Sequence, residues 1–238
     1  MTGIASGTVL SMDMKSAAAI AKKENARVAK LIGIKTSARC TTVKPAGTTS
    51  LVLGCSSGIH AWHNSHYIRR LRVGKNEAIY WYLAAHHPEL IEDEYFRPHD
   101  TAIISIPQRA PMGSILRTES PIQTLERVKK VAEEWVNTGH RRGDNTHNVS
   151  ATISIRDHEW DAVGQWMWDN KYSYNGLSVL PYDGGTYTQA PFEDIDECEY
   201  NRLLQSLTDL DLTKVIELED NTDLSGEAAC AGGACEVT

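Results

Sequence analysis

The sequence predicts an α/β fold, because strand-like and helix-like segments alternate along its 238 residues. Runs rich in β-branched and apolar residues, typical of strands, stand at 41–44, 102–106, 149–155 and 177–180. Segments with apolar residues three and four apart, typical of amphipathic helices, stand at 15–32, 120–136 and 157–170. This alternation favours a sheet that is at least partly parallel.

The first predicted helix runs from Lys15 to Ile32. Its alanines, together with Ile20, Val28 and Leu31, supply an apolar stripe, and lysines supply the opposite face. Gly33 directly follows the last periodic residue and is expected to end the helix.

The next segment predicts a strand, a turn and a short helix. Residues 41–44 form a β-branched run that Pro45 stops, which is consistent with a buried strand. A turn at Pro45-Ala46-Gly47 is followed by a helix over 48–53, which Gly54 closes.

The helix at 120–136 has the clearest start signal. Ser120 stands at the N-cap, Pro121 at the first helical position and Gln123 where a capping box needs an acceptor. The segment 157–170 is the second amphipathic candidate.

The composition is that of a soluble globular protein, with 41% hydrophobic and 23% charged residues. We find no apolar run of the roughly 18 residues that a membrane span needs. The first residues show no basic flank followed by an apolar run, so a signal peptide is not predicted. We therefore expect a cytoplasmic protein with no membrane partner.

The net charge of −7 is concentrated at one end of the chain. Residues 206–238 contain one base, Lys214, and eight acids: Asp209, Asp211, Glu217, Glu219, Asp220, Asp223, Glu227 and Glu236. This separates a neutral body, 1–205, from an acidic tail, 206–238, that is expected to be flexible. A neutral body argues against a nucleic-acid polymer as partner.

Residues 44–51 form the first candidate site. A strand is expected to end there, a glycine turn allows close approach of the backbone to a ligand, and a helix begins, so a phosphate could bind. The candidate substrate-binding residues are Ala46, Gly47, Thr48, Thr49 and Ser50. The sequence lacks the P-loop pattern, and an ordinary turn with a threonine N-cap remains the alternative.

Cys230 and Cys235 form the second candidate site. Four small residues, two of them glycines, separate the two cysteines and would let their sulfurs meet. A zinc site normally takes four ligands, and no second Cys or His pair is near in sequence, so no metal is predicted. A redox dithiol on an arm is the interpretation that uses these features, with an inert pair as the alternative.

A histidine-rich segment carries a weaker signal. The spacing of His60, His63 and His66 could place two imidazoles on one helical face, but cleft-lining or surface histidines are the simpler interpretation. The adjoining basic run 67–72 either packs against acids or faces an anionic ligand.

The run Val43-Lys44-Pro45-Ala46-Gly47-Thr48-Thr49-Ser50 resembles the phosphate-loop signature of class II, adenosylcobalamin-dependent ribonucleotide reductases. Further segments follow in that family's order: Gly58-Ile59-His60, Tyr67-Ile68-Arg69-Arg70, Asp144-Asn145, Asn148-Val149-Ser150, Leu180-Pro181-Tyr182, Gly184-Gly185 and Gln189-Ala190-Pro191. The terminal Cys230–Cys235 segment is similar to the family's shuttle pair. The resemblance is greatest to the monomeric ribonucleoside-triphosphate reductase branch and covers nearly the whole chain.

The resemblance implies that 1–205 form the C-terminal portion of a ten-stranded α/β barrel. It further implies adenosylcobalamin as cofactor, although no cobalamin-contacting residue is identified, and a ribonucleotide di- or triphosphate as substrate. Ala46 to Ser50 would hold the substrate phosphates. Cys230 and Cys235 would be the catalytic shuttle that a thioredoxin-type reductant resets.

One departure from the family qualifies these implications. The family's radical loop reads Asn-Pro-Cys-x-Glu, and no cysteine in this chain follows a proline. We therefore expect an N-terminal reductase part with the radical cysteine as partner, and the starting methionine favours a split enzyme over a fragment. The alternative is a non-catalytic nucleotide-binding or thiol redox-relay protein.

Overall fold

The computed structural model describes residues 1–182, 184, 187–207 and 209–219. Contacts divide the chain into two compact units. Unit 1 consists of 1–62 and 111–182, and unit 2 of 63–110 and 183–238. In the part of the chain that is described, no helix is long and apolar enough to cross a membrane.

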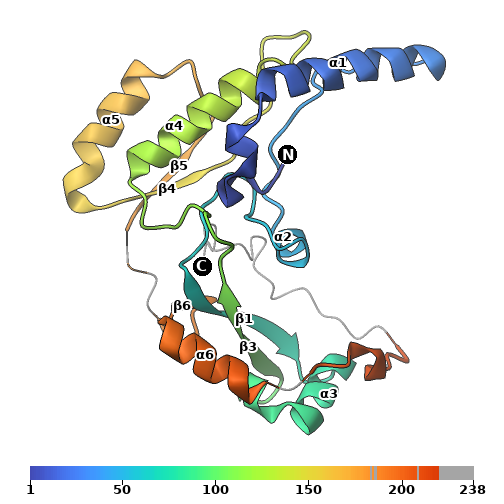
Figure 1. Ribbon diagram of the computed structural model, residues 1–238, viewed down its shortest axis with the longest axis vertical. Coiled ribbons are helices and arrows are strands. Elements are labelled where there is room, and N and C mark those ends of the chain that lie inside the picture. The colour runs from blue at the N-terminus through green and yellow to red at the C-terminus, as the bar shows by residue number, and fades with distance from the viewer. Residues whose placement is uncertain (183, 185–186, 208, 220–238) are drawn as a thin grey trace. The chain divides into compact units, whose positions relative to one another are not determined.

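Figure 1 shows the elements of both units. The helices are α1 (Met14–Leu31), α2 (Thr48–Val52), α3 (Ala78–His86), α4 (Pro121–Val131), α5 (Trp160–Asp169) and α6 (Glu197–Ser206). The strands are β1 (His66–Gly74), β2 (Ile91–Asp93), β3 (Thr101–Arg109), β4 (Thr152–Ile155), β5 (Ser178–Pro181) and β6 (Phe192–Asp194).

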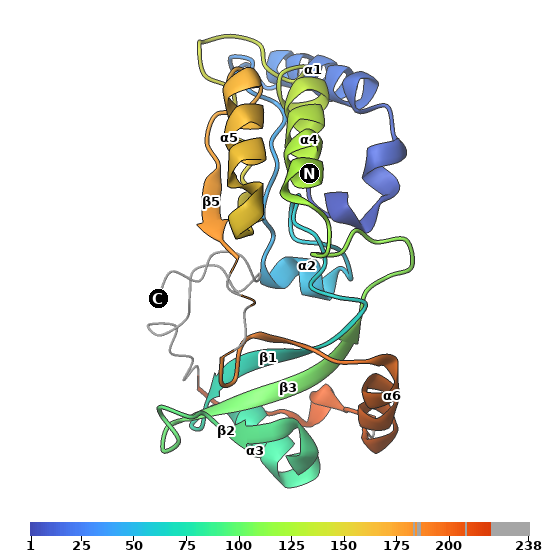
Figure 2. The same ribbon diagram turned by 90° about the vertical axis from the view of Figure 1, so that its left-hand side faces the viewer.

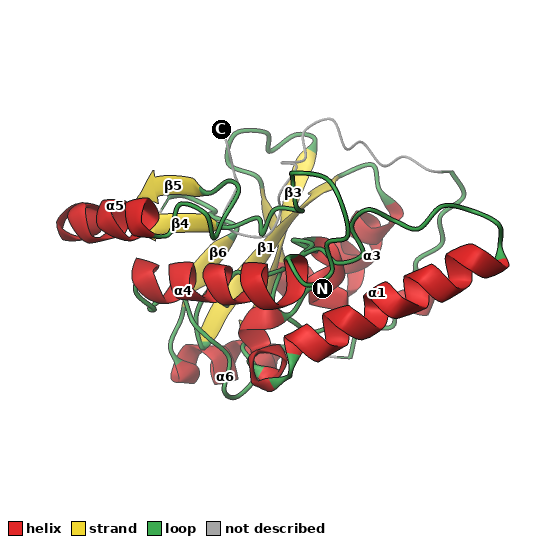
Figure 3. Cartoon of the chain, turned by 90° about the horizontal axis from the view of Figure 1, so that it is seen from above, coloured by secondary structure: helices red, strands yellow, loops and turns green. Residues whose placement is uncertain are grey.

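Unit 1 confirms the predicted α/β alternation. β4 and β5 pair in parallel, with Thr152 opposite Ser178, and α5 connects them. α4 lies against β4 and beside α5 (Figures 2 and 3). The apolar faces of these elements form the core of the unit, whose fully buried members include Leu125, Val128 and Ile153.

The predicted start of α4 is confirmed in detail. The backbone N–H of Gln123 donates to Ser120 Oγ at 3.3 Å, and the N–H of Ser120 donates to Gln123 Oε1 at 2.8 Å. Pro121 occupies the first turn, where its missing N–H costs nothing. The helix continues into a π-helical turn at Ala132–Val136, which brings the element to the predicted end.

The strand predicted at 41–44 is wrong. The segment buries Thr41 and Val43, but it pairs with no strand in the part of the chain that the structure describes. The side chains pack along the end of α4 instead, where Thr41 Oγ1 donates to the carbonyl of Trp135 at 2.7 Å. Burial accounts for the β-branched pattern here, and the backbone bonds to loops, as in Lys44 N–H to the carbonyl of Met1 at 2.9 Å.

Gly139 is required by this packing. A Cβ on Gly139 would lie 1.9 Å from Thr41 Oγ1, and Thr41 is buried and hydrogen-bonded. We expect Gly139→Ala to lower the free energy of unfolding by about 1–3 kcal/mol, as overpacking does. The exposed helical Gly164 has nothing within 4 Å of a Cβ, so Gly164→Ala should instead stabilise by roughly 0.5–1 kcal/mol. Urea unfolding of both variants measures the difference, and equal effects would contradict this account.

The helix predicted at 15–32 is confirmed as α1, with Gly33 at φ 74° just beyond its end. The predicted apolar stripe is packed only in part, however. Ile20 and Leu31 are 67% and 70% exposed, whereas Ala18 and Ala29 are buried. Small side chains let the helix approach the π-helical turn Ala132–Val136 closely, so Ala18 and Ala29, rather than the larger residues, are buried.

Unit 2 is an antiparallel sheet in the order β2-β3-β1-β6, with α3 and α6 connected to it. β1 pairs with β3 from His66 opposite Arg109 to Gly74 opposite Thr101. The predicted strand at 102–106 is therefore confirmed. Its partner β1 contains the basic run 67–72, for which the sequence predicts no strand. The sheet's core members include Val73, Tyr82, Leu83 and Ala102.

Candidate functional site

The predicted phosphate loop is a turn that leads into α2. Gly47 takes the left-handed conformation, with φ 49°, and its N–H donates to Ser57 Oγ at 3.2 Å. The N–H of Thr49 donates to the carbonyl of Ala46 at 3.0 Å, and that of Ser50 to the carbonyl of Gly47 at 3.1 Å. The predicted helix at 48–53 is confirmed as α2.

Two hydroxyl groups of this loop are placed differently. Ser50 is 4% exposed, and its Oγ donates to the carbonyl of Gly47 at 2.5 Å, so this hydroxyl holds the turn closed. Thr49 is exposed. A Cβ built on Gly47 would meet no atom within 4 Å, so the described residues leave space open beside its backbone. Thr49 and Gly47 are therefore two loop positions that a ligand can reach; Ala46 is half-buried, and the side chain of Thr48 lies outside the described part of the chain.

A second loop, 55–60, packs against the turn at 45–47. Gly58 has φ 57°, and a Cβ on it would lie 3.1 Å from Pro45 Cα and 3.3 Å from the carbonyl oxygen of Lys44. Its N–H donates to Thr2 Oγ1 at 2.9 Å, and its carbonyl accepts from the N–H of Ile4 at 2.9 Å. Only a residue without a side chain fits this close contact between the two loops.

Arg127 of α4 fixes the supporting loop. It is buried, its Nε donates to the carbonyl of Ile59 at 3.2 Å, and its two Nη groups bind Glu119 in bidentate fashion at 2.6 and 2.5 Å. The Glu119 side chain is 11% exposed. A buried guanidinium is stable here because a carboxylate and a carbonyl occupy its donors.

His60 joins the same loop to β4. Its Nε2 accepts from the N–H of Thr152 at 3.2 Å, so the proton lies on Nδ1, which faces the carbonyl of Ser57 at 3.2 Å. Burial lowers the pKa of His60 below its ordinary value of 6.5; the bond to Ser57 opposes this, and the charge of Arg127 adds to it. The ring is thus a neutral connector between two segments.

This lowered pKa predicts a pH dependence of stability. The unfolded chain binds a proton at His60 more readily than the folded chain does, so the contribution is complete above about pH 6.5 and is lost as the pH falls from there. We expect the free energy of unfolding to fall less steeply below that pH in His60→Gln than in the unmodified chain. His99→Gln is the control, because the His99 side chain is 78% exposed. Identical pH profiles for all three proteins would contradict the assignment.

The other histidines do not share a helical face with His60. His66 begins β1 and lies against Tyr200, and the segment between them is not helical. His63 Nε2 is 2.9 Å from Asp194 Oδ1, and its ring stacks on Phe192 at 4.9 Å. Within the described ranges, no group of three His, Cys, Asp or Glu side chains could hold a metal ion.

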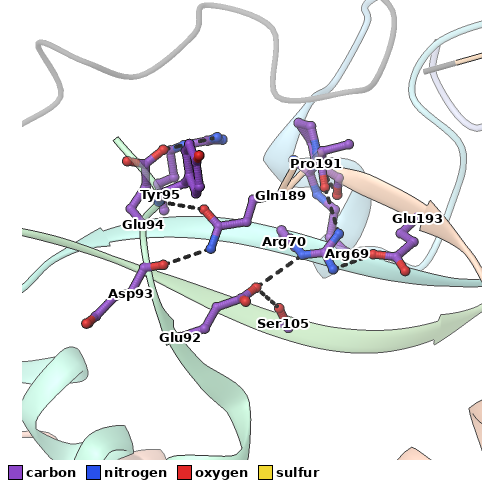
Figure 4. A network of polar contacts seen from close by, with 12 residues as sticks. Arg69, Arg70, Glu92, Asp93, Glu94, Tyr95, Ser105, Gln189, Pro191 and Glu193 are labelled. Atoms are coloured by element: carbon purple, nitrogen blue, oxygen red, sulfur yellow. Dashed lines mark hydrogen bonds and ion pairs between the residues drawn. The ribbon is translucent and has the colours of Figure 1, made fainter. Parts of the chain in front are cut away.

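The basic run of β1 packs against acids in unit 2. Figure 4 shows Arg70 between Glu92 and Glu193, both of which it contacts as ion pairs. Arg69 is buried, donates to the carbonyl of Pro191 at 3.3 Å and lies over the Phe192 ring at 4.3 Å. These contacts support the structural interpretation of the run over an anion site.

Gln189 connects the same region to the edge of the sheet. Its Oε1 accepts from the N–H of Tyr95 at 2.8 Å, and its Nε2 donates to the carbonyl of Asp93 at 2.7 Å (Figure 4). Gln189 has φ 57°, a conformation that non-glycine residues rarely adopt. The two hydrogen bonds compensate for that strain.

The predicted dithiol, Cys230 and Cys235, lies outside the described residues. Of the remaining cysteines, Cys40 and Cys55 are half-buried and Cys198 is exposed. Sequence reasoning missed Arg127 and Glu119, which the structure places behind the loop. Arg127 stands four residues before the buried Val131, so helical spacing puts it on the apolar face of α4, and a charge at such a position was the available signal.

No family model matches the chain. Comparisons with individual proteins do find similar ones, and those described below are reductases of one kind. An adenosylcobalamin-dependent ribonucleoside-triphosphate reductase of Lactobacillus delbrueckii subsp. bulgaricus is 29% identical over 221 residues, which cover 87% of this chain and 28% of that protein. The reductase of the same name from Euglena gracilis is 28% identical over 218 residues, covering 88% and 28%.

A solved structure gives the same result. The crystal structure of a B-12-dependent (class II) ribonucleotide reductase superimposes with a TM-score of 0.67 and 25% identity, over 82% of this chain and 28% of that one. The resemblance predicted from the motifs is therefore confirmed. The chain spans little more than a quarter, 28%, of the length of these relatives.

Proposed function

We propose that this chain is the C-terminal part of an adenosylcobalamin-dependent ribonucleotide reductase, to which it contributes the substrate-phosphate loop and the dithiol shuttle. The observation that carries the proposal is similarity along 87% of the chain to reductases of this kind. The body, 1–205, would complete the family's ten-stranded α/β barrel together with the rest of the enzyme.

The rest of the enzyme must supply the radical cysteine, because no cysteine of this chain follows a proline. That part belongs either to the same polypeptide or to a separate subunit; the relatives carry both in one chain. Adenosylcobalamin would supply the radical by breaking its cobalt–carbon bond. No residue of this chain is assigned to the cofactor.

The loop geometry supports phosphate binding at Thr49 and Gly47. The N–H groups of Thr49 and Ser50 are occupied by carbonyls of the turn, so the Thr49 hydroxyl is the exposed donor among these three groups. The open space at Gly47 would let a phosphate approach the backbone. Ser50 would act indirectly, by holding the carbonyl of Gly47 in place.

Loop variants test the proposal by nucleotide affinity. Losing one hydrogen bond to a charged group should weaken binding by roughly 10- to 150-fold in Thr49→Val. Gly47→Val should weaken it further, since a branched side chain would fill the open space and strain a positive φ. The measurement is the dissociation constant of a ribonucleoside triphosphate for the assembled reductase.

Thr42→Val is the matched control, because Thr42 is also exposed and lies in the same segment before the turn. Its affinity should remain within about twofold of the unmodified protein. Unchanged affinity in both Thr49→Val and Gly47→Val would mean that the loop is an ordinary turn between an extended segment and a helix.

The terminal dithiol would restore the active-site cysteines after each turnover. One tail thiolate attacks the active-site disulfide and forms a mixed disulfide with it. The second tail thiolate then attacks this mixed disulfide, which releases the active-site cysteines as thiols and leaves a disulfide in the tail. A thioredoxin-type dithiol finally reduces the tail disulfide. Two electrons and two protons move in each exchange. The acidic tail would carry the pair between these two partners.

A further inference from the structure

After α6, the chain segment that contains Leu207, Asp211 and Val215 packs against the core of unit 2 beside α3. Leu207 and Val215 are partly buried against the core of unit 2, which includes Tyr82 and Leu83 of α3. Between them, the N–H of Asp211 donates to the Tyr82 hydroxyl at 3.2 Å. The described residues of this stretch, 207 and 209–216, therefore combine apolar contacts at Leu207 and Val215 with a hydrogen bond at Asp211.

A short 3₁₀ turn gives this stretch a defined shape. Asp211 caps the turn Leu212–Lys214 by accepting from the N–H and Oγ1 of Thr213 at 3.2 and 2.5 Å, and it pairs with Lys214 at 3.5 Å. Ile216, next to the docked Val215, is 73% exposed. Of these two neighbours, Val215 packs against the core and Ile216 is mostly exposed.

We propose that residues 207–216 are the fixed root of the redox arm, held on α3 by Tyr82. The inference rests on the proposed function, because it takes Cys230 and Cys235 as the shuttle. In a tail free from Ser206 onward, Cys230 would follow 24 residues later; with the root docked, it follows Val215 by 15.

The root sets the reach of the dithiol. A chain extends by at most about 3.3–3.6 Å per residue, so Cys230 can lie no farther than roughly 50 Å from Val215, against roughly 80 Å from a free Ser206. A shorter tether also raises the local concentration of the dithiol within its range, about twofold for this change in length. Docking therefore shortens the distance that the dithiol can reach and raises how often it meets a partner within that distance.

Hydrogen exchange on the full chain tests the docking without any enzyme assay. Tyr82→Phe removes the acceptor and should speed exchange at the Asp211 amide roughly fivefold, the effect of one ordinary hydrogen bond. Tyr80→Phe is the matched control on the same helix and should leave that amide unchanged. Val215→Ser should speed exchange across 209–216, whereas Ile216→Ser should not. Equal exchange in all four variants would overturn the root.

Tether length tests the consequence in the assembled reductase. Deleting residues 218–225 places Cys230 only 7 positions after Val215 instead of 15, and we expect thioredoxin-driven turnover to fall at least tenfold as the reach halves. Adding Leu207→Ser and Val215→Ser should restore most of it by releasing the root. Loss without restoration, or no loss at all, would overturn the root; harmless substitution of Cys230 would instead refute the shuttle itself.

Discussion

Arg127→Met is expected to lower the free energy of unfolding by about 3–5 kcal/mol, because it leaves the carboxylate of Glu119 buried without its partner. The same change removes the donor to the carbonyl of Ile59, so the loop 55–60, which contacts the proposed phosphate-binding turn, loses a hydrogen bond that holds it. We therefore expect weaker nucleotide binding together with lower stability. Denaturant unfolding followed by Trp fluorescence measures the loss of stability.

Lys130→Met provides the matched control, since it removes a positive charge from the same helix. Lys130 pairs with Glu134, but its side chain is 43% exposed, so the cost should be no more than about 0.5 kcal/mol. The double variant Arg127→Met/Glu119→Leu should recover most of the stability, as apolar replacements of buried pairs do. Equal losses in the Arg127 and Lys130 variants would contradict the buried-pair account.

Cys230→Ser or Cys235→Ser should abolish thioredoxin-driven turnover of the assembled reductase, because either change removes one sulfur of the exchanging pair. One round of reduction from a prereduced enzyme should survive, since the tail acts after the chemistry. Small dithiols that enter the site directly should partly rescue both variants. The measurement is deoxynucleotide formed per enzyme, with each reductant in turn.

Cys198→Ser is the control for the dithiol, because Cys198 is also exposed but lies on α6. Its thioredoxin-driven turnover should match that of the unmodified protein. Full thioredoxin-driven turnover in Cys230→Ser would show that the pair is inert, which is the alternative the sequence left open.

The sequence predicted those elements whose signals are local. The capping box of α4 depends only on Ser120, Pro121 and Gln123, and the helix begins where they indicate. β4, α5 and β5 follow each other along the chain, so their alternation predicted a parallel pair. Glycines at positive φ marked the ends of α1 and α2 correctly, at Gly33 and Gly54.

Elements that depend on distant partners could not be predicted in this way. Arg69 is one of the buried residues of β1, where the Phe192 ring and the carbonyl of Pro191, over 120 residues away in sequence, contact its side chain. The segment 41–44 has strand-like composition without a partner strand. Likewise, the predicted stripe of α1 included the alanines that are buried, but also Ile20 and Leu31, which are exposed.

The sequence predicted which segment forms the candidate site, but not how its side chains are buried or which other segments contact it. The motif located the turn, but its sequence could not separate the exposed Thr49 from the buried Ser50, because the difference depends on how the turn closes on Gly47. The contact of Gly58 with Pro45 and the bond from Arg127 to Ile59 join segments that the chain order keeps apart. The dithiol remains a prediction from the sequence.

Complementation tests the central claim most directly. The full chain is combined with an N-terminal part of a class II reductase that carries Asn-Pro-Cys-x-Glu, and ribonucleotide reduction is assayed with adenosylcobalamin and a dithiol. We predict deoxynucleotide formation by the combination and none by either part alone. Turnover by this chain alone, or a stable complex that binds nucleotide without reducing it, would contradict the proposal; the second result would favour a nucleotide-binding or thiol-relay protein.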